Sequence, residues 1–120
     1  MAQFAWLEAA VSVKLEVGEI NMTTVLVTYT GTKEDRFDRN HYVNVHLPMS
    51  ERLLGSYGLV SAEALFPATT RSSILASCTL TFRDDEALHA AMSAPEMALL
   101  IEDLKNFTNM TPVQYRLVAD

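Results

Sequence analysis

The sequence is poor in cysteine and glycine, and it contains no long apolar run. Its one cysteine, Cys78, cannot form an intrachain disulfide, so a reducing compartment suits the chain. The four glycines occur in neither G-x-G-x-x-G nor Walker spacing, which removes the common phosphate-binding loops. No segment approaches about 18 consecutive apolar residues, so we expect no membrane-spanning helix.

Positive charge is also scarce. There are nine Lys and Arg residues against fifteen Asp and Glu, the formal net charge is -6, and the cationic residues are scattered. Nucleic-acid binding needs a basic surface, so we expect no nucleic-acid partner. A secretory signal begins with positive charge, whereas the first charged side chain here is Glu8, which predicts a cytoplasmic protein. A chain of 120 residues that is 49% hydrophobic suits one globular domain.

Residue patterns predict four strands and two helices after residue 22. Strand-like runs bounded by turn residues occupy 23–30, 59–66, 74–82 and 112–118. Asp38 is a good N-cap for a helix that runs toward Leu54. Asp84 or Asp85 caps a second helical region, which restarts after Pro95. This order of elements predicts an α+β fold, a ferredoxin-like βαββαβ sandwich.

The strand at 74–82 alternates between two faces, and only one of them is apolar. Cys78 lies on the apolar face, so we expect a buried, inert thiol. The other face is too small and mixed to be a solvated charged surface, since it carries Leu75, Ser77, Thr79 and Thr81. Either the sheet of a second subunit covers this face, or the face contacts water, as antiparallel sheets allow.

The first 21 residues do not belong to the βαββαβ count. VSVKLEV at 11–17 alternates like a strand, and FAWLEAA at 4–10 fits a helical turn. We therefore divide the chain into an N-terminal extension, 1–21, and a domain, 22–120. The extension is either an extra strand or arm that docks on a sheet edge, including that of a partner subunit, or a non-native addition.

The stretch FDRNHYVNVHLP, at 37–48, concentrates the polar chemistry of the chain. Helical spacing places five side chains on one buried face, namely Tyr42, Val45, His46, Met49 and Leu53. Pro48 cannot donate to the carbonyl of Asn44, so the helix is expected to kink beside His46 and open a cavity.

Imidazole titrates near neutrality, which makes His46 the first candidate for a general acid or base. The alternative is a structural histidine that bonds a backbone carbonyl. Tyr42 either donates to a substrate oxygen or is a core residue, and the same choice holds for Tyr29 at the end of the first strand. His41 is expected to face solvent or a dimer edge, and His89 to be exposed.

Metal ligation has little support in the sequence. His41 and His46 are five residues apart, which does not place both on one helix face. The chain has no H-E-x-x-H motif, no C-x-x-C motif and no acidic ligand cluster. We therefore expect neither a metal nor another cofactor.

From Thr23 to Val118 the chain resembles the EthD family, named after ethyl tert-butyl ether degradation. The most specific match is the pattern formed by Phe37, Asp38, Tyr42, His46 and Pro48. VLVTY, RLLGSYGL, LTFRDDEALHAAM and DLKNFTNMTPV match in family order and spacing. The extension before Met22 departs from the family pattern.

The resemblance implies a homodimer whose two sheets face each other in a dimeric α/β barrel. It also implies that Asp103 occupies the place of a family acidic residue before an aromatic. There it either orients a partner group or is a surface carboxylate. Some relatives lie in degradation clusters beside a cytochrome P450 system, and others resemble dehydratases or decarboxylases of polyketide-type aromatics.

These observations favour a cofactor-free enzyme for dehydration, decarboxylation, cyclisation or isomerisation of a small, apolar, oxygenated or aromatic compound. His46 is its expected acid/base, with Tyr42 or Tyr29 stabilising an oxyanion or enol. We expect the substrate to contact Tyr29, Met49, Phe37 and Asp103. The alternatives are a ligand-binding accessory to an oxygenase system and, more remotely, a haem protein with His46 as axial ligand.

Overall fold

The computed structural model describes residues 5–9, 22–69 and 71–118. Its strands are β1 (Ala5–Ala9), β2 (Thr23–Thr30), β3 (Leu59–Leu65), β4 (Ile74–Phe82) and β5 (Val113–Leu117). Its α-helices are α1 (Arg39–His41), α2 (Leu47–Leu54), α3 (Asp85–Met92) and α4 (Met97–Asp103). A π-helical segment, η1 (Tyr42–His46), joins α1 to α2, and two 3-10 turns are η2 (Gly55–Tyr57) and η3 (Leu104–Asn106).

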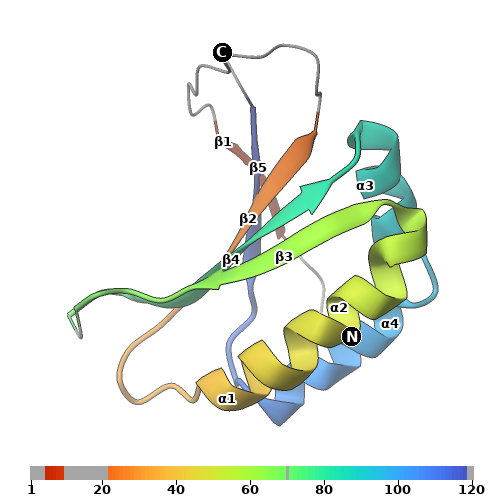
Figure 1. The fold of residues 1–120 in the computed structure, drawn as a ribbon. Helices are drawn as coiled ribbons and strands as arrows, with labels where there is room; N and C mark the ends of the chain where they lie inside the picture. The colour runs from red at the N-terminus through yellow and green to blue at the C-terminus, as the bar shows by residue number, and fades with distance from the viewer. Residues whose placement is uncertain (1–4, 10–21, 70, 119–120) are drawn as a thin grey trace.

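The strands form one sheet in the order β1-β5-β2-β4-β3. The four strands after residue 22 pair antiparallel, and the helices lie on one side of the sheet (Figure 1). This is the ferredoxin-like arrangement, so the predicted fold class and element order are confirmed. No helix in the described ranges is long and apolar enough to cross a membrane.

β1 adds to the edge of this sheet, running parallel to β5 with Trp6 opposite Gln114. The helical turn predicted over 4–10 is therefore wrong, because Ala5–Ala9 is a strand. Without β1, β5 would be an edge strand with unpaired backbone N–H and C=O groups, and an extended segment can form hydrogen bonds with them. The strand predicted at 11–17 lies outside the described residues.

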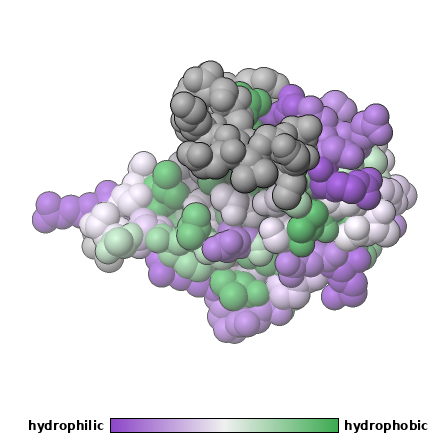
Figure 2. Space-filling model, turned by 45° about the horizontal axis from the view of Figure 1, so that its top comes forward, coloured by the Kyte–Doolittle hydropathy of each residue, from purple (hydrophilic) through white to green (hydrophobic). Residues whose placement is uncertain are grey.

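The core lies between the sheet and the helices. The helix-facing residues of β4 are buried, among them Ala76, Cys78, Leu80 and Phe82, as the alternation predicted. Cys78 is a free, buried thiol, and burial raises its pKa to about 11. The opposite face of β4 is half-buried. On the molecular surface, hydrophobic residues form separate patches among hydrophilic ones (Figure 2).

The helical region differs from the sequence expectation at one point. Asp38 is the N-cap and accepts a hydrogen bond from the backbone N–H of His41 at 3.1 Å, as predicted. Before Pro48, however, the chain forms the π-helical η1, in which the N–H of Leu47 donates to the carbonyl of Tyr42. Proline cannot make the α-helical hydrogen bond, and the chain accommodates this with a wider, π-helical turn before Pro48.

The π turn changes which residues face the core. After His46 the buried positions are Leu47, Ser50 and Leu54, because a π turn holds more residues than an α turn and shifts the residues that follow it around the helix. The predicted face had Met49 and Leu53, which are only half-buried. Val45, also predicted to be buried, is 45% exposed. Beyond η1 the buried face is therefore shifted by one residue from the predicted face, from Met49 and Leu53 to Ser50 and Leu54.

Candidate functional site

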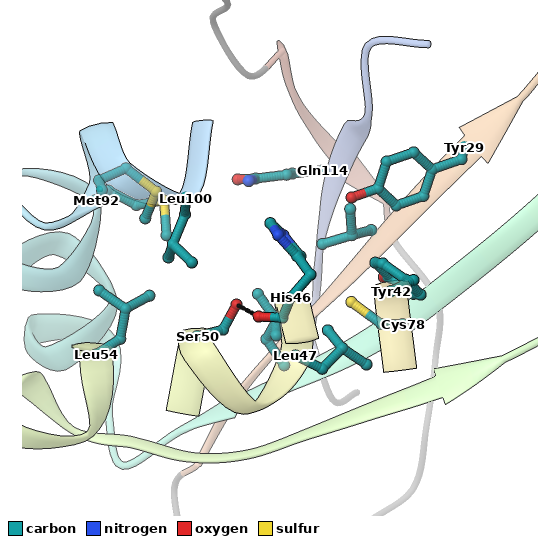
Figure 3. Close-up of a pocket in the computed structure, with 13 residues that line it drawn as sticks. Tyr29, Tyr42, His46, Leu47, Ser50, Leu54, Cys78, Met92, Leu100 and Gln114 are labelled. Carbon is teal, nitrogen blue, oxygen red and sulfur yellow. Dashed lines mark hydrogen bonds between the residues drawn. The ribbon is translucent and has the colours of Figure 1, made fainter. Parts of the chain in front are cut away.

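A cavity lies between the sheet and the helices, directly against η1. Its walls come from β2, β4, β5, η1, α2, α3 and α4, and the lining includes Tyr29, Tyr42, His46, Cys78, Met92 and Gln114 (Figure 3). The cavity is small, with about 40 Å³ open to the centres of water molecules. Since one buried water needs roughly 10–15 Å³ on such a measure, there is room for a few waters or a few ligand atoms.

An aromatic cluster forms one side of this cavity. The ring of Tyr42 is stacked on that of His46, with centroids 5.8 Å apart. Phe107 packs 4.6 Å from the His46 ring, and Tyr29 packs edge-on against Tyr42 at 5.4 Å. Since Tyr42 and Phe107 are fully buried, the His46 ring is held in a rigid apolar surround.

His46 is oriented by a carboxylate. Its Nδ1 lies 2.9 Å from Oδ2 of Asp103, at the end of α4. Two further groups donate to the same carboxylate, the Nε2 of His41 at 3.0 Å and the Nδ2 of Asn106 at 2.9 Å. The helix that carries His46 is tied to this region, because the N–H of Asp38 donates to the carbonyl of Phe107 at 2.7 Å.

The protonation states follow from this geometry. Burial lowers the pKa of His46 below its ordinary value, and the hydrogen bond to Asp103 opposes that effect only partly. Burial acts to raise the pKa of Asp103, but hydrogen bonds from Asn106, His46 and His41 outweigh it, so the carboxyl pKa is lowered. At neutral pH His46 is therefore neutral, with its proton on Nδ1 directed at a carboxylate. The Nε2 lone pair has no hydrogen bond to a described residue, and the ring projects into the cavity (Figure 3).

Two polar side chains of the cavity, one on η1 and one on β5, bury an atom without a well-formed hydrogen bond. The hydroxyl of Tyr42 is buried beside Tyr29 and the Cys78 thiol without a well-formed hydrogen bond, and Oε1 of Gln114 is buried with no partner among the described residues. Burial raises the pKa of the Tyr42 and Tyr29 hydroxyls, so both are neutral groups that can donate a hydrogen bond.

The structure brings together only some of the residues that the sequence proposed for the site. Tyr29, Tyr42 and His46 line the cavity. Asp103 lies behind His46 as its hydrogen-bond partner. Phe37 and Met49 are not among the lining residues. Phe37 packs 5.0 Å from the rings of Tyr29 and Tyr42, and Met49 packs against the core.

Two residues of the site were not anticipated. His41 was expected to face solvent or a dimer edge, yet it bonds Asp103 and stacks on Phe107, with 23% of its side chain exposed. Its spacing to His46 suggested different helix faces, but Asp103 reaches both from another helix. Alternation in PVQYRLV places Gln114 on one face with Arg116, away from Val113 and Tyr115, so the strand alone predicts an outward-facing side chain, yet Gln114 is buried.

Among the described residues, no group of three or more His, Cys, Asp or Glu side chains is arranged to hold a metal ion. The polar side chains that converge at His46 instead bond one another through Asp103.

Comparisons with known proteins connect this geometry to a family. A family model described as the EthD domain matches residues 30–111. An EthD-like protein from Ralstonia eutropha JMP134 is 28% identical at a TM-score of 0.65, with 78% of this chain and 87% of that chain covered. No curated protein matches the chain.

Two more distant solved structures show the fold alone. An EthD family protein from Bacillus halodurans C-125 is 19% identical at a TM-score of 0.54, covering 76% of this chain and 95% of its own. SnoaB, a cofactor-independent oxygenase from Streptomyces nogalater, is 10% identical at a TM-score of 0.57, with 78% of this chain and 90% of that chain covered.

Proposed function

The chain belongs to the EthD family, and within it we propose a cofactor-independent acid/base enzyme whose base is His46. The observation that carries this proposal is the bond from Nδ1 of His46 to Asp103 beside a cavity into which the ring projects. A neutral imidazole held in this way has a fixed tautomer and presents Nε2 as a proton acceptor.

The chemistry would begin with removal of one proton from the substrate. When Nε2 of His46 takes that proton, the imidazolium is stabilised by the Asp103 carboxylate, which stays ionised because its pKa is low. The protonated ring can then return the proton elsewhere on the substrate. Dehydration, decarboxylation, cyclisation and isomerisation all use such a transfer, and the mainly apolar lining suits a small apolar, oxygenated or aromatic substrate.

The experiment is deuterium incorporation from D2O into small ketones, such as cyclohexanone and 2-indanone, followed by proton NMR. We expect the protein to accelerate exchange of the hydrogens next to the carbonyl, and His46→Gln to reduce the accelerated rate by about 10²- to 10⁴-fold. His89→Gln is the matched control, because His89 is an exposed histidine on α3. Equal rates in wild type and His46→Gln would remove His46 from the role of base.

A second candidate is a binding protein that holds a small ligand for a partner oxygenase system. The apolar lining of the cavity favours it, since burial of a hydrophobic ligand needs no reaction. Binding of a ketone without exchange would identify this function. The third possibility, haem, is tested by the absorbance spectrum after haem addition, although a porphyrin is far larger than the cavity.

We further propose that the chain is a homodimer that pairs the helix-free faces of two sheets. This proposal is supported by the half-buried, mixed residues on that face of β4 and by Tyr115 and Leu117 of β5, which point the same way. Cytoplasmic location and the division at residue 22 remain predictions from the sequence. Sedimentation of the full chain tests the dimer, and a monomer at micromolar concentration would exclude it.

A further inference from the structure

Gln114 is the least expected residue of the cavity. It lies on β5 opposite Val27 of β2, on the helix-facing side of the sheet, and is 2% exposed. Its amide and the ring of His46 project into the same space (Figure 3). An apolar residue would be usual at such a position, because the neighbouring strands place Val27, Cys78 and Leu80 there.

The amide of Gln114 has no hydrogen bond to any described residue. Its Oε1 is buried without a partner among these residues. A buried polar group left unpaired destabilises a folded protein, so few such groups are kept. Rotation about the terminal torsion exchanges the two ends of the amide, and the group can therefore offer the cavity either a donor or an acceptor.

We propose that Gln114 binds the oxygen of an enolisable carbonyl compound whose neighbouring C–H bond faces Nε2 of His46. This inference rests on the proposed base function of His46. The C–H bond breaks, its proton moves to Nε2, and its electron pair forms a C=C bond while the carbonyl π pair moves onto oxygen. The Nε2–H of Gln114 donates to that oxygen, whose negative charge grows as the enolate forms. Return of the proton regenerates a neutral carbonyl compound, and no oxidant is consumed.

The neighbouring surface indicates where the rest of such a ligand lies. Met92 and Met97 form a wall shared by the cavity and a surface groove along α4, which has about 690 Å³ open to the centres of water molecules. Methionine side chains are flexible, so this wall can adapt to a ligand that passes it. The substrate class is therefore a carbonyl group on an apolar body, with the carbonyl end in the cavity and the remainder directed toward the groove.

The test measures the carbonyl contact separately from proton transfer. Cyclohexanone labelled with ¹³C at the carbonyl is titrated with wild type and with Gln114→Met, which keeps a side chain of similar length without the amide. A hydrogen bond to the oxygen moves the carbonyl resonance downfield. We expect the bound shift in the variant to lie upfield of that in wild type, and deuterium exchange to fall by about 10²- to 10³-fold. Gln114→Asn, which keeps an amide, should restore part of both.

The outcomes separate the two proposals. Identical bound shifts and exchange rates in wild type and Gln114→Met would overturn the role of Gln114 and leave the base function of His46 standing. A shift that depends on Gln114, without exchange in wild type, would support the carbonyl site and reject the base.

If Gln114→Met does not fold, the ¹⁵N-labelled side-chain amide of Gln114 in wild type provides the measurement. Its resonances should move on addition of cyclohexanone and not of methylcyclohexane. No movement, with the amide bonded only to buried water, would overturn the proposal.

Discussion

The two ends of the cavity differ in how well their polar groups are hydrogen-bonded. At the α4 end, the Asp103 carboxylate accepts hydrogen bonds from three side chains, those of His41, His46 and Asn106. At the sheet end, Tyr42 and Gln114 each bury a polar atom without a well-formed hydrogen bond to a described residue. His46 belongs to both ends, because its Nδ1 bonds Asp103 and the opposite edge of its ring faces the cavity.

One end of the site is therefore preorganised by hydrogen bonds, whereas the other end has buried polar atoms that a ligand can bond. The satisfied end fixes the tautomer and direction of His46 before anything binds, which is what a general base needs. The unsatisfied end carries a free-energy cost that only a ligand or ordered water can remove. Substitutions at the two ends should therefore change stability in opposite directions.

The largest effect is expected from Asp103→Ala. This change leaves three donors without their shared acceptor, two of them on buried or half-buried histidines, and should lower the free energy of unfolding by about 3 kcal/mol. Urea denaturation measures it. Glu102→Ala is the control, because Glu102 is an exposed carboxylate on the same helix that pairs with the exposed Lys105. A similar small loss in both variants would mean that the network does not hold this end together.

The same network predicts an acid-labile fold. The pKa of His46 is lowered in the folded state, so below about 6.5 the unfolded chain binds more protons and stability falls as pH falls. The lowered pKa of Asp103 adds a second loss, because its contribution is present above about 3.9 and disappears as pH drops through the folded value. Denaturation between pH 7 and pH 5 should show a shallower slope in His46→Gln than in wild type. Parallel slopes would contradict the shift assigned to His46.

The fold could be predicted because it is set by long, simple patterns. Strict alternation at 74–82, the Asp38 cap and the restart after Pro95 each appear in the structure where the sequence placed them. These features depend on neighbours in sequence, so local propensity and hydrophobic periodicity were enough.

The site could be predicted only in part, for two physical reasons. The π turn at η1 moved the buried face from Met49 to Ser50, and a period of 3.6 residues cannot anticipate it. The two histidine partners of Asp103 come from a segment about 60 residues away, so no spacing rule links His41 or His46 to it. Gln114 gave no such signal either, because alternation places it with Arg116 on the polar side of its strand, and only its pairing with Val27 shows that this side faces the core.

A smaller effect, of opposite sign, is expected from Tyr42→Phe. The change removes a buried hydroxyl that has no well-formed hydrogen bond beside Tyr29 and Cys78. It keeps the ring that packs against Tyr29, Phe37 and Phe107, so stability should stay the same or rise by up to about 1 kcal/mol. Tyr57→Phe is the matched comparison, since its hydroxyl donates to Glu96 at 2.7 Å and its loss should lower stability. Destabilisation by Tyr42→Phe would show that its hydroxyl has a partner, such as a buried water.

The smallest expected effect belongs to His41→Gln. The side chain of His41 is 23% exposed and supplies one of three donors to Asp103, so its loss should cost less than about 1 kcal/mol. Its more specific consequence concerns His46, because electrostatic interaction with His41 adds to burial in lowering the pKa of His46. Removing His41 should raise the pKa of His46, as measured by NMR titration of the His46 ring, whereas His89→Gln should leave it unchanged. An unchanged pKa in His41→Gln would mean that Asp103 screens the two rings from each other, and that the satisfied end tunes His46 through the carboxylate alone.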